Sequence, residues 1–162
     1  MPLDSPWTRA TAAVQGATLR SNEVMDALAA EVCNHESSHA VAAVLLGRRL
    51  FYVSRDRNLC GTTFSTRGDS EPIYGLVALL APYYSGDPTL SHLDLEKVDA
   101  LARSDPRLEI EVFKAHEMAR ELVKRPDFRS AHRAIRWALF SHPFLTGEEV
   151  ALLIALDKEE HV

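Results

Sequence analysis

The strongest constraint in the sequence is a pair of histidines, His35 and His39, four residues apart within an apolar stretch. Apolar residues recur there in alternating steps of four and three, along one helical stripe that includes both histidines. The run Ala-Val-Ala-Ala-Val-Leu-Leu after His39 is apolar on all sides, so this end of the helix should be buried. The pattern predicts one long helix from about Ser21 through Leu46, with Gly47 ending it.

Histidines at this spacing point the same way from a helix, so two imidazoles can bind one metal ion. In His35-Glu36-Ser37-Ser38-His39, the glutamate lies about 100° around the helix from the first histidine. Zinc lowers the pKa of a bound water towards about 7, and a neighbouring glutamate can accept its proton during attack on a peptide carbonyl. Burying unpaired imidazoles is costly, which favours metal binding over simple packing. The motif therefore predicts a zinc site with Glu36 as general base.

A catalytic zinc site has three protein ligands and an open fourth position, so a third ligand must come from elsewhere in the chain. Spacing alone does not choose it, because this ligand needs only to be near in space. The candidates are His92, Asp94, Asp87, Glu96, Asp99 and His116.

The rest of the chain predicts a mainly helical domain with a small β element. Two short segments rich in β-branched and aromatic residues predict a hairpin, at Leu50–Ser54 and Cys60–Ser65. Helices are expected near Glu71–Tyr84, Leu93–Arg103, Pro106–Lys124, Asp127–Phe140 and Gly147–Leu156. Residues 1–20 are weakly patterned and should form an arm or short helix, followed by a single domain over residues 21–162. The predicted fold class is mainly α (α+β).

Composition excludes several other classes of protein. Apolar residues make up 46% and charged residues 25%, the balance of a soluble globular domain. With 18 basic and 23 acidic residues the net charge is −5, which argues against a nucleic-acid partner. No apolar run approaches the ~18 residues of a membrane span, and no secretion signal is evident, so we expect a cytoplasmic protein. Cys33 and Cys60 lack the C-x-x-C spacing of a thiolate metal site, and we expect reduced thiols.

The order of motifs resembles the peptidase domain of the FtsH-type ATP-dependent zinc proteases. In that family a His-Glu-Ala-Gly-His-Ala helix is followed by a strand pair and a helix. A segment reading Asn-Asp-Leu/Ile-Glu-Arg-Ala-Thr-Asp-Leu-Ala-Arg comes next, then a helical tail with a Leu-x-Gly-Glu-Glu-like element. The matching segments here span roughly residues 30–155 and are His35–Val41, Gly61–Phe64, Leu76–Ala81, Asp94–Arg103 and Leu145–Val150.

The resemblance implies a helical zincin-like peptidase fold in which His35, His39 and Asp94 bind zinc and Glu36 is the catalytic base. The sequence departs from the family at several positions. Ser-Ser replaces Ala-Gly inside the motif, Leu93 stands where the family has Asn, and residues 81–86 lack the family's Gly-Arg-x-Ala-Glu stretch. Neither a Walker motif nor a membrane anchor is evident, so ATP-driven unfolding is not implied.

We therefore expect a stand-alone zinc metallopeptidase acting on peptides or unfolded segments. A separately encoded protein could act as its partner. Gly61, Thr62 and Thr63 are candidate substrate-binding residues, because an edge strand can pair with an extended peptide. An ordinary hairpin strand fits these residues equally well. The alternative function is a non-catalytic, zinc-stabilised module that binds peptides or proteins, although Glu36 favours the enzyme. A regulatory zinc peptidase specific for one repressor is a third possibility, and the Asp94–Arg103 match argues against its fold.

Among the remaining candidates, His92 could rival Asp94 as the third ligand, and an exposed loop histidine is the simpler interpretation. Cys33 is expected to be a small buried residue. The large aromatic residues are expected to be core or interface anchors; they are Trp7, Trp137 and Phe140.

Overall fold

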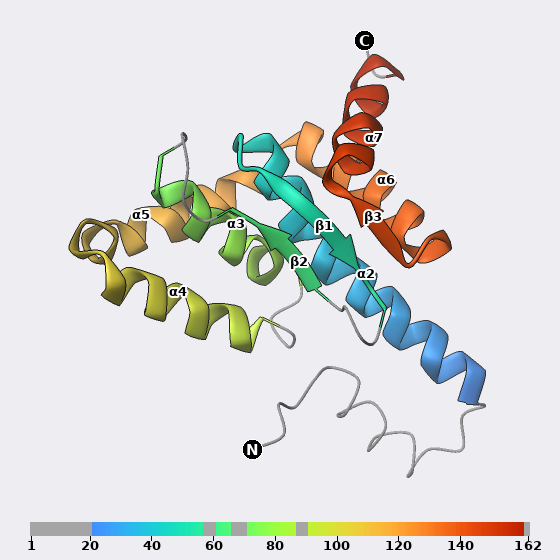
Figure 1. Cartoon of the computed structure of the whole chain (residues 1–162), viewed down its shortest axis with the longest axis horizontal. Helices are drawn as coiled ribbons and strands as arrows, with labels where there is room; N and C mark the ends of the chain where they lie inside the picture. Colours follow the sequence, from blue (N-terminus) through green and yellow to red (C-terminus); the bar gives the residue numbers. More distant parts are fainter. Residues whose placement is uncertain (1–20, 57–60, 66–70, 87–90, 161–162) are drawn as a thin grey trace.

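The computed structural model describes residues 21–56, 61–65, 71–86 and 91–160. The expected N-terminal arm, with Trp7, lies outside the described residues, as do Cys60 and Asp87. The fold class is as predicted: the described residues are 75% helical, with a small three-stranded antiparallel sheet (Figure 1). Its elements are α2 (Ser21–Leu45), β1 (Leu50–Ser54), β2 (Gly61–Phe64), α3 (Ile73–Tyr84), α4 (His92–Ser104), α5 (Pro106–Leu122), α6 (Pro126–Ser141), β3 (Phe144–Thr146) and α7 (Gly147–Glu160).

The long helix α2 is the centre of the molecule and ends where the sequence predicts. Gly47 has a φ of +71°, a left-handed conformation that glycine adopts without strain. Its N–H donates to the carbonyl of Val44 at 3.1 Å, and the Arg48 N–H donates to the carbonyl of Ala43 at 2.8 Å. These two bonds satisfy carbonyls that would otherwise be orphaned at the helix end. The chain can therefore reverse directly into β1.

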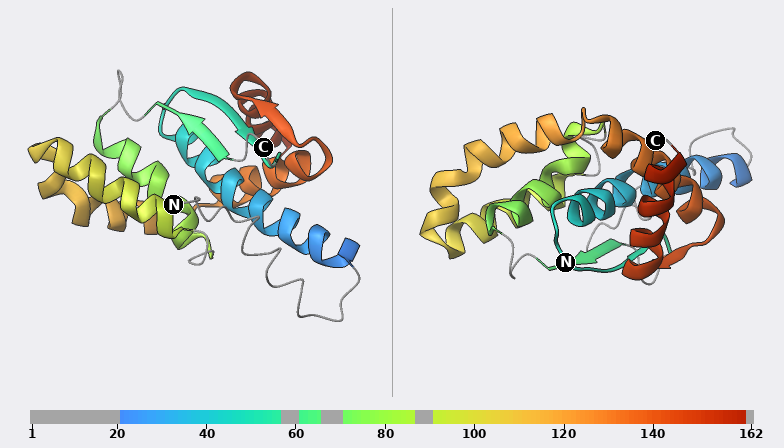
Figure 2. Two further views of the ribbon diagram at one scale, coloured as in Figure 1. Left: turned by 60° about the horizontal axis from the view of Figure 1, so that its bottom comes forward. Right: turned by 90° about the horizontal axis from the view of Figure 1, so that it is seen from above.

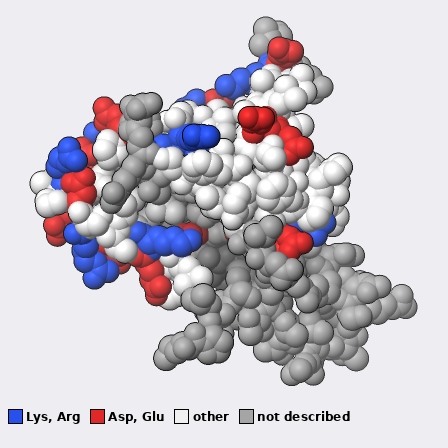
Figure 3. Space-filling view, viewed as in Figure 1, with Lys and Arg blue, Asp and Glu red and all other residues white. Residues whose placement is uncertain are grey.

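Helices pack around α2 on several sides. It contacts α3 and α6 most extensively and also carries the sheet, whereas α4 and α5 pair with each other against α3 (Figure 2). Helix α3 is buried over most of its length, which explains why its sequence is apolar without a clear stripe. On the face shown in Figure 3, acidic and basic side chains are interspersed over α4 and α5, while the surface above the sheet is mostly uncharged.

The sheet has the order β2-β1-β3, with both pairings antiparallel. The predicted hairpin of β1 and β2 is confirmed, with Val53 opposite Thr62. Strand β3 has only three residues, too few for an alternating pattern, and sequence analysis missed it. Its Leu145 pairs with Val53 from the other side. Strand β2 is therefore an edge strand of the sheet and lies against α2.

Trp137 and Phe140, expected to be core or interface anchors, do not lie in the core. Their exposed fractions are 64% and 38%. Helix α6 turns a different stripe inward, and the buried residues on it are Phe128, Ala131, Ile135 and Leu139. Trp137 comes two positions after Ile135, which places it on the opposite side of the helix.

Candidate metal centre

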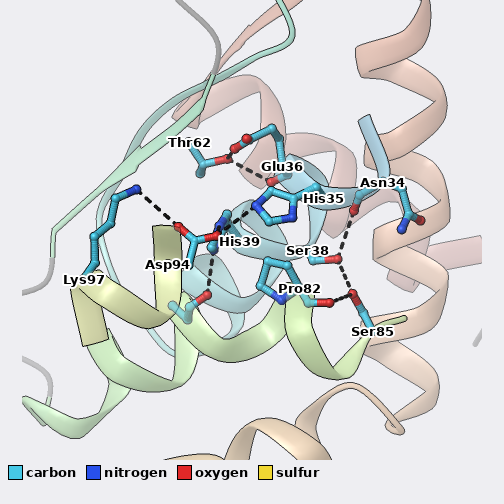
Figure 4. A network of polar contacts seen from close by, with 11 residues as sticks. Asn34, His35, Glu36, Ser38, His39, Thr62, Pro82, Ser85, Asp94 and Lys97 are labelled. Carbon is cyan, nitrogen blue, oxygen red and sulfur yellow. Dashed lines mark hydrogen bonds and ion pairs between the residues drawn. The ribbon is translucent and has the colours of Figure 1, made fainter. Parts of the chain in front are cut away.

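Three predicted ligands from two helices converge on one point. His35 and His39 come from α2, and Asp94 is the third residue of α4. The Nε2 atoms of the two histidines lie 2.9 and 3.0 Å from the same oxygen of Asp94, Oδ2 (Figure 4). All three residues are buried, and their ligand atoms lie within 4.8 Å of one another. This cluster could hold a metal ion.

The other candidates for third ligand lie elsewhere. The exposed side chains of His92 and Glu96 pair with each other at 3.3 Å, and Asp99 is exposed on α4. Nδ1 of His116 lies 2.7 Å from the hydroxyl of Tyr84, and His116 is not part of the cluster. Among the described candidates, Asp94 is the one whose carboxylate reaches both histidines.

The donor set of the cluster fits a cation. Nδ1 of His39 lies 2.9 Å from the carbonyl oxygen of Ala78, and a carbonyl only accepts, so this nitrogen carries the hydrogen. In a neutral ring, Nε2 then presents a lone pair to the Asp94 oxygen 3.0 Å away. Two lone pairs facing each other at that distance repel unless a proton or a metal ion lies between them. Two imidazoles and one carboxylate are also the ligand types of catalytic zinc sites.

The electrostatics of the cluster keep Asp94 ionised. Burial by itself would raise the pKa of Asp94, but its hydrogen bonds with His35 and His39 hold that pKa well below the usual range. Burial by itself would lower the pKa of His39, and the contact with Asp94 raises it instead. Nζ of Lys97 lies 3.2 Å from the other carboxylate oxygen of Asp94, Oδ1. The carboxylate is therefore oriented with Oδ2 towards the histidines.

The two histidines differ in how firmly they are held. His39 is fixed through both ring nitrogens, by Asp94 and by the Ala78 carbonyl. His35 has a buried Nδ1 with no hydrogen-bond partner among the described residues. Its orientation within the described part of the chain depends on Asp94 and on an edge-to-face contact with His39, with ring centroids 4.9 Å apart.

Glu36 lies beside the cluster, on the side of α2 that faces β2. Its side chain is largely buried, with 8% of the residue exposed. The hydroxyl of Thr62 contacts the Glu36 carboxylate at 2.7 Å and the Glu36 backbone carbonyl at 2.9 Å. Sequence reasoning placed Thr62 with Gly61 and Thr63 in a substrate-binding strand and missed this contact. Whether the strand binds substrate remains a prediction, although its position at the sheet edge is the one such binding requires.

A second polar network lies behind the ligands and was also missed. The Ser38 hydroxyl lies 2.7 Å from the Ser85 hydroxyl and 3.1 Å from Nε2 of His132. That same nitrogen lies 2.9 Å from the carbonyl oxygen of Asn34. Burial lowers the pKa of His132. The network links α2 to α6 and to the C-terminal end of α3. The pair of serines inside an apolar helical run is the feature of the sequence that indicates such a network.

Comparisons with known proteins identify no family. No protein-family model matches the chain, and a search of curated proteins found no match. Within the described ranges, none of the helices combines the length and the apolar character needed to cross a membrane. Functional inference therefore depends on the geometry of the cluster and its surroundings.

Proposed function

We propose that this protein is a zinc metallopeptidase, similar in its peptidase fold to the FtsH-type proteases, that cleaves exposed or unfolded segments. The observation that carries the proposal is the buried convergence of His35, His39 and Asp94 directly beside the carboxylate of Glu36. Three protein ligands on a four-coordinate ion leave one position open, which is typical of catalytic rather than structural zinc sites. The matching order of motifs around these residues supports the same conclusion.

When bound at these ligands, zinc would supply an activated water and polarise the peptide carbonyl. The residues of the chain supply the rest. Glu36 would accept a proton during attack and return it to the nitrogen of the departing amine. His39 and Asp94 are held in ligating orientations by the Ala78 carbonyl and by Lys97, respectively.

An extended substrate would run along the free edge of β2. The backbone groups of Gly61, Thr62 and Thr63 would then pair with the backbone of the substrate, as in other cases of strand addition. Such pairing requires an unfolded or flexible segment and makes little use of side-chain identity. Broad sequence tolerance is the expected consequence.

A non-catalytic binding module is the alternative. It would need the metal ligands for stability but would have no use for a buried, hydrogen-bonded carboxylate next to them. Burying such a group is unfavourable unless it is paired, and Glu36 is both buried and bonded to Thr62. This favours the enzyme.

Metal analysis combined with a peptide-library cleavage assay tests the proposal. We expect about one zinc per chain and cleavage of many peptides. Glu36→Gln keeps the size of the side chain but removes the base, so it should abolish cleavage while leaving zinc content and folding unchanged. Equal cleavage by wild type and Glu36→Gln would exclude the mechanism, and an inert, zinc-loaded wild type would support the binding module.

A further inference from the structure

The hydroxyl of Thr62 has two acceptors on one residue. It lies 2.7 Å from Oε2 of Glu36 and 2.9 Å from the backbone oxygen of the same residue. A hydroxyl carries one hydrogen, so it cannot donate fully to both. A carboxylate is the stronger acceptor and the contact to it is the shorter, so the carboxylate receives the hydrogen bond.

Glu36 has no other hydrogen bond among the described residues that fixes its carboxylate. A glutamate side chain has three rotatable bonds and loses much conformational freedom when it is held in one orientation. Among the described residues of α2, none donates a hydrogen bond to the carboxylate, and the side chain of the neighbouring His35 contacts Asp94. The orientation of this carboxylate is therefore determined by strand β2.

Thr62 is well placed for this role because its own position is rigid. It pairs with Val53, a fully buried residue of the central strand β1. Threonine is β-branched, which restricts its χ1 rotation. Gly61 precedes it with a φ of +135°, a conformation that other residues rarely adopt, and this directs the chain into the strand.

We infer that Thr62 is a positioning residue, whose side-chain hydroxyl holds the Glu36 carboxylate beside the metal ligands. This inference rests on the proposed function, in which Glu36 is the base. It assigns the side chain of Thr62 a role separate from any backbone pairing between β2 and a substrate. Strand β2 would thus both pair with the substrate through its backbone and hold the general base through the Thr62 side chain.

Steady-state kinetics of zinc-loaded variants test the catalytic part. Thr62→Val keeps the shape of the side chain and removes the hydroxyl, so kcat should fall about tenfold or more while KM changes less than about twofold. Thr62→Ser restores a hydroxyl and should recover most of the lost kcat. An unchanged kcat in Thr62→Val, or a change confined to KM, would overturn the inference.

Thr146→Val is the matched control for stability. Thr146 caps α7 through Glu149, so its loss should destabilise the fold without touching the metal centre. We expect its kcat to equal that of the wild type at temperatures where both proteins are folded. A fall in kcat equal to that of Thr62→Val would show a general effect of destabilisation and would overturn the positioning role.

A double-mutant cycle tests the pairing without using activity. Urea unfolding midpoints are compared for Thr62→Val in the wild-type background and in a Glu36→Ala background. If the hydroxyl serves the carboxylate, Thr62→Val should lower the midpoint clearly in the wild type and much less in Glu36→Ala. If it serves only the backbone carbonyl, the two shifts will be equal, and the inference fails.

The two kinds of failure are distinguishable. A zinc-loaded wild type that cleaves nothing in a peptide library contradicts the proposed function, whereas the cycle still reports whether Thr62 holds Glu36. Active wild type with equal midpoint shifts contradicts the positioning role alone.

Discussion

At the scale of single residues, the candidate metal centre depends most on Asp94, because one oxygen of its carboxylate contacts both histidines. Asp94→Ala removes that atom, and the loss of zinc affinity should exceed the roughly 10- to 100-fold typical of changes outside the ligand shell. Zinc content after dialysis against a competing chelator measures it. Asp99→Ala, on the exposed side of the same helix, should keep its zinc. Zinc retained in Asp94→Ala but lost in His92→Ala would contradict the assignment.

His132 should give the fold a dependence on pH. Burial lowers its pKa, an effect that the hydrogen bond to the Asn34 carbonyl opposes only in part. In the unfolded chain a histidine takes up its proton at about pH 6.5, so below that pH the unfolded state binds more protons than the folded state. The contribution of His132 to the free energy of unfolding is therefore complete above that pH and is lost as the pH falls towards the lower pKa of the folded state.

Urea unfolding midpoints measured from about pH 8 down to about pH 5 check this sign. The decline at low pH should be steeper in the wild type than in His132→Gln, which has no group that titrates at this position. Both proteins share any loss of stability that comes from the metal ligands, so their difference isolates His132. Parallel curves would contradict the prediction.

At the scale of elements, α7 depends on the close approach of its first residue to β1. A β-carbon added to Gly147 would overlap the carbonyl oxygen of Leu50, which is backbone and cannot rotate away. Gly147→Ala should therefore lower the free energy of unfolding by about 3 kcal/mol, because the helix or the strand must shift. Ala155→Gly, at an exposed site within α7, is the comparison and should cost about 1 kcal/mol. Urea unfolding of both variants measures these losses, and equal decreases in the free energy of unfolding would contradict the prediction.

The helices and the hairpin could be predicted because their signals are local. The apolar stripe of α2, the left-handed Gly47 and the prolines that begin α5 and α6 all act on residues near them in sequence. Strand β3 could not be predicted, since three residues carry too little pattern and their pairing depends on β1, about 90 positions away in the chain. The face of α6 that is buried depends on α2 in the same way, so local pattern alone could not show that Trp137 lies outside the core.

The residues of the candidate site likewise divide into those with a local sequence signal and those that depend on distant parts of the chain. His35, Glu36 and His39 could be found because helical spacing alone brings them together. Asp94 could not be chosen from spacing, and the resemblance to a known family supplied it. The contact between Thr62 and Glu36 joins residues 26 positions apart. A hydrogen bond across that separation cannot be predicted from local sequence pattern.

At the scale of the whole molecule, the proposed peptidase should act without ATP. A folded substrate exposes few extended segments, and local opening costs little at termini and loop tips but much more in a stable core. The sequence contains no Gly-x-x-x-x-Gly-Lys-Ser/Thr motif that would couple nucleotide hydrolysis to unfolding. The purified chain should therefore cleave unfolded proteins and flexible tails and largely spare stable folds. Comparing a stable protein with its destabilised variant, each with and without ATP, tests this; ATP-stimulated degradation of the stable form would contradict it.

The residues of the candidate metal centre are distant in sequence, since Asp94 lies 59 positions from His35 and 55 from His39. An ion bound to all three residues would cross-link distant parts of the chain. Like a disulfide, this cross-link would remove conformations from the unfolded ensemble. Helix α4 buries few side chains of its own, namely Asp94, Val98 and Ala102. In chelated protein, its amide hydrogens should therefore exchange with solvent before those of α2 or α3. The candidate metal centre would then also stabilise the fold, and removal of the metal would release α4 first.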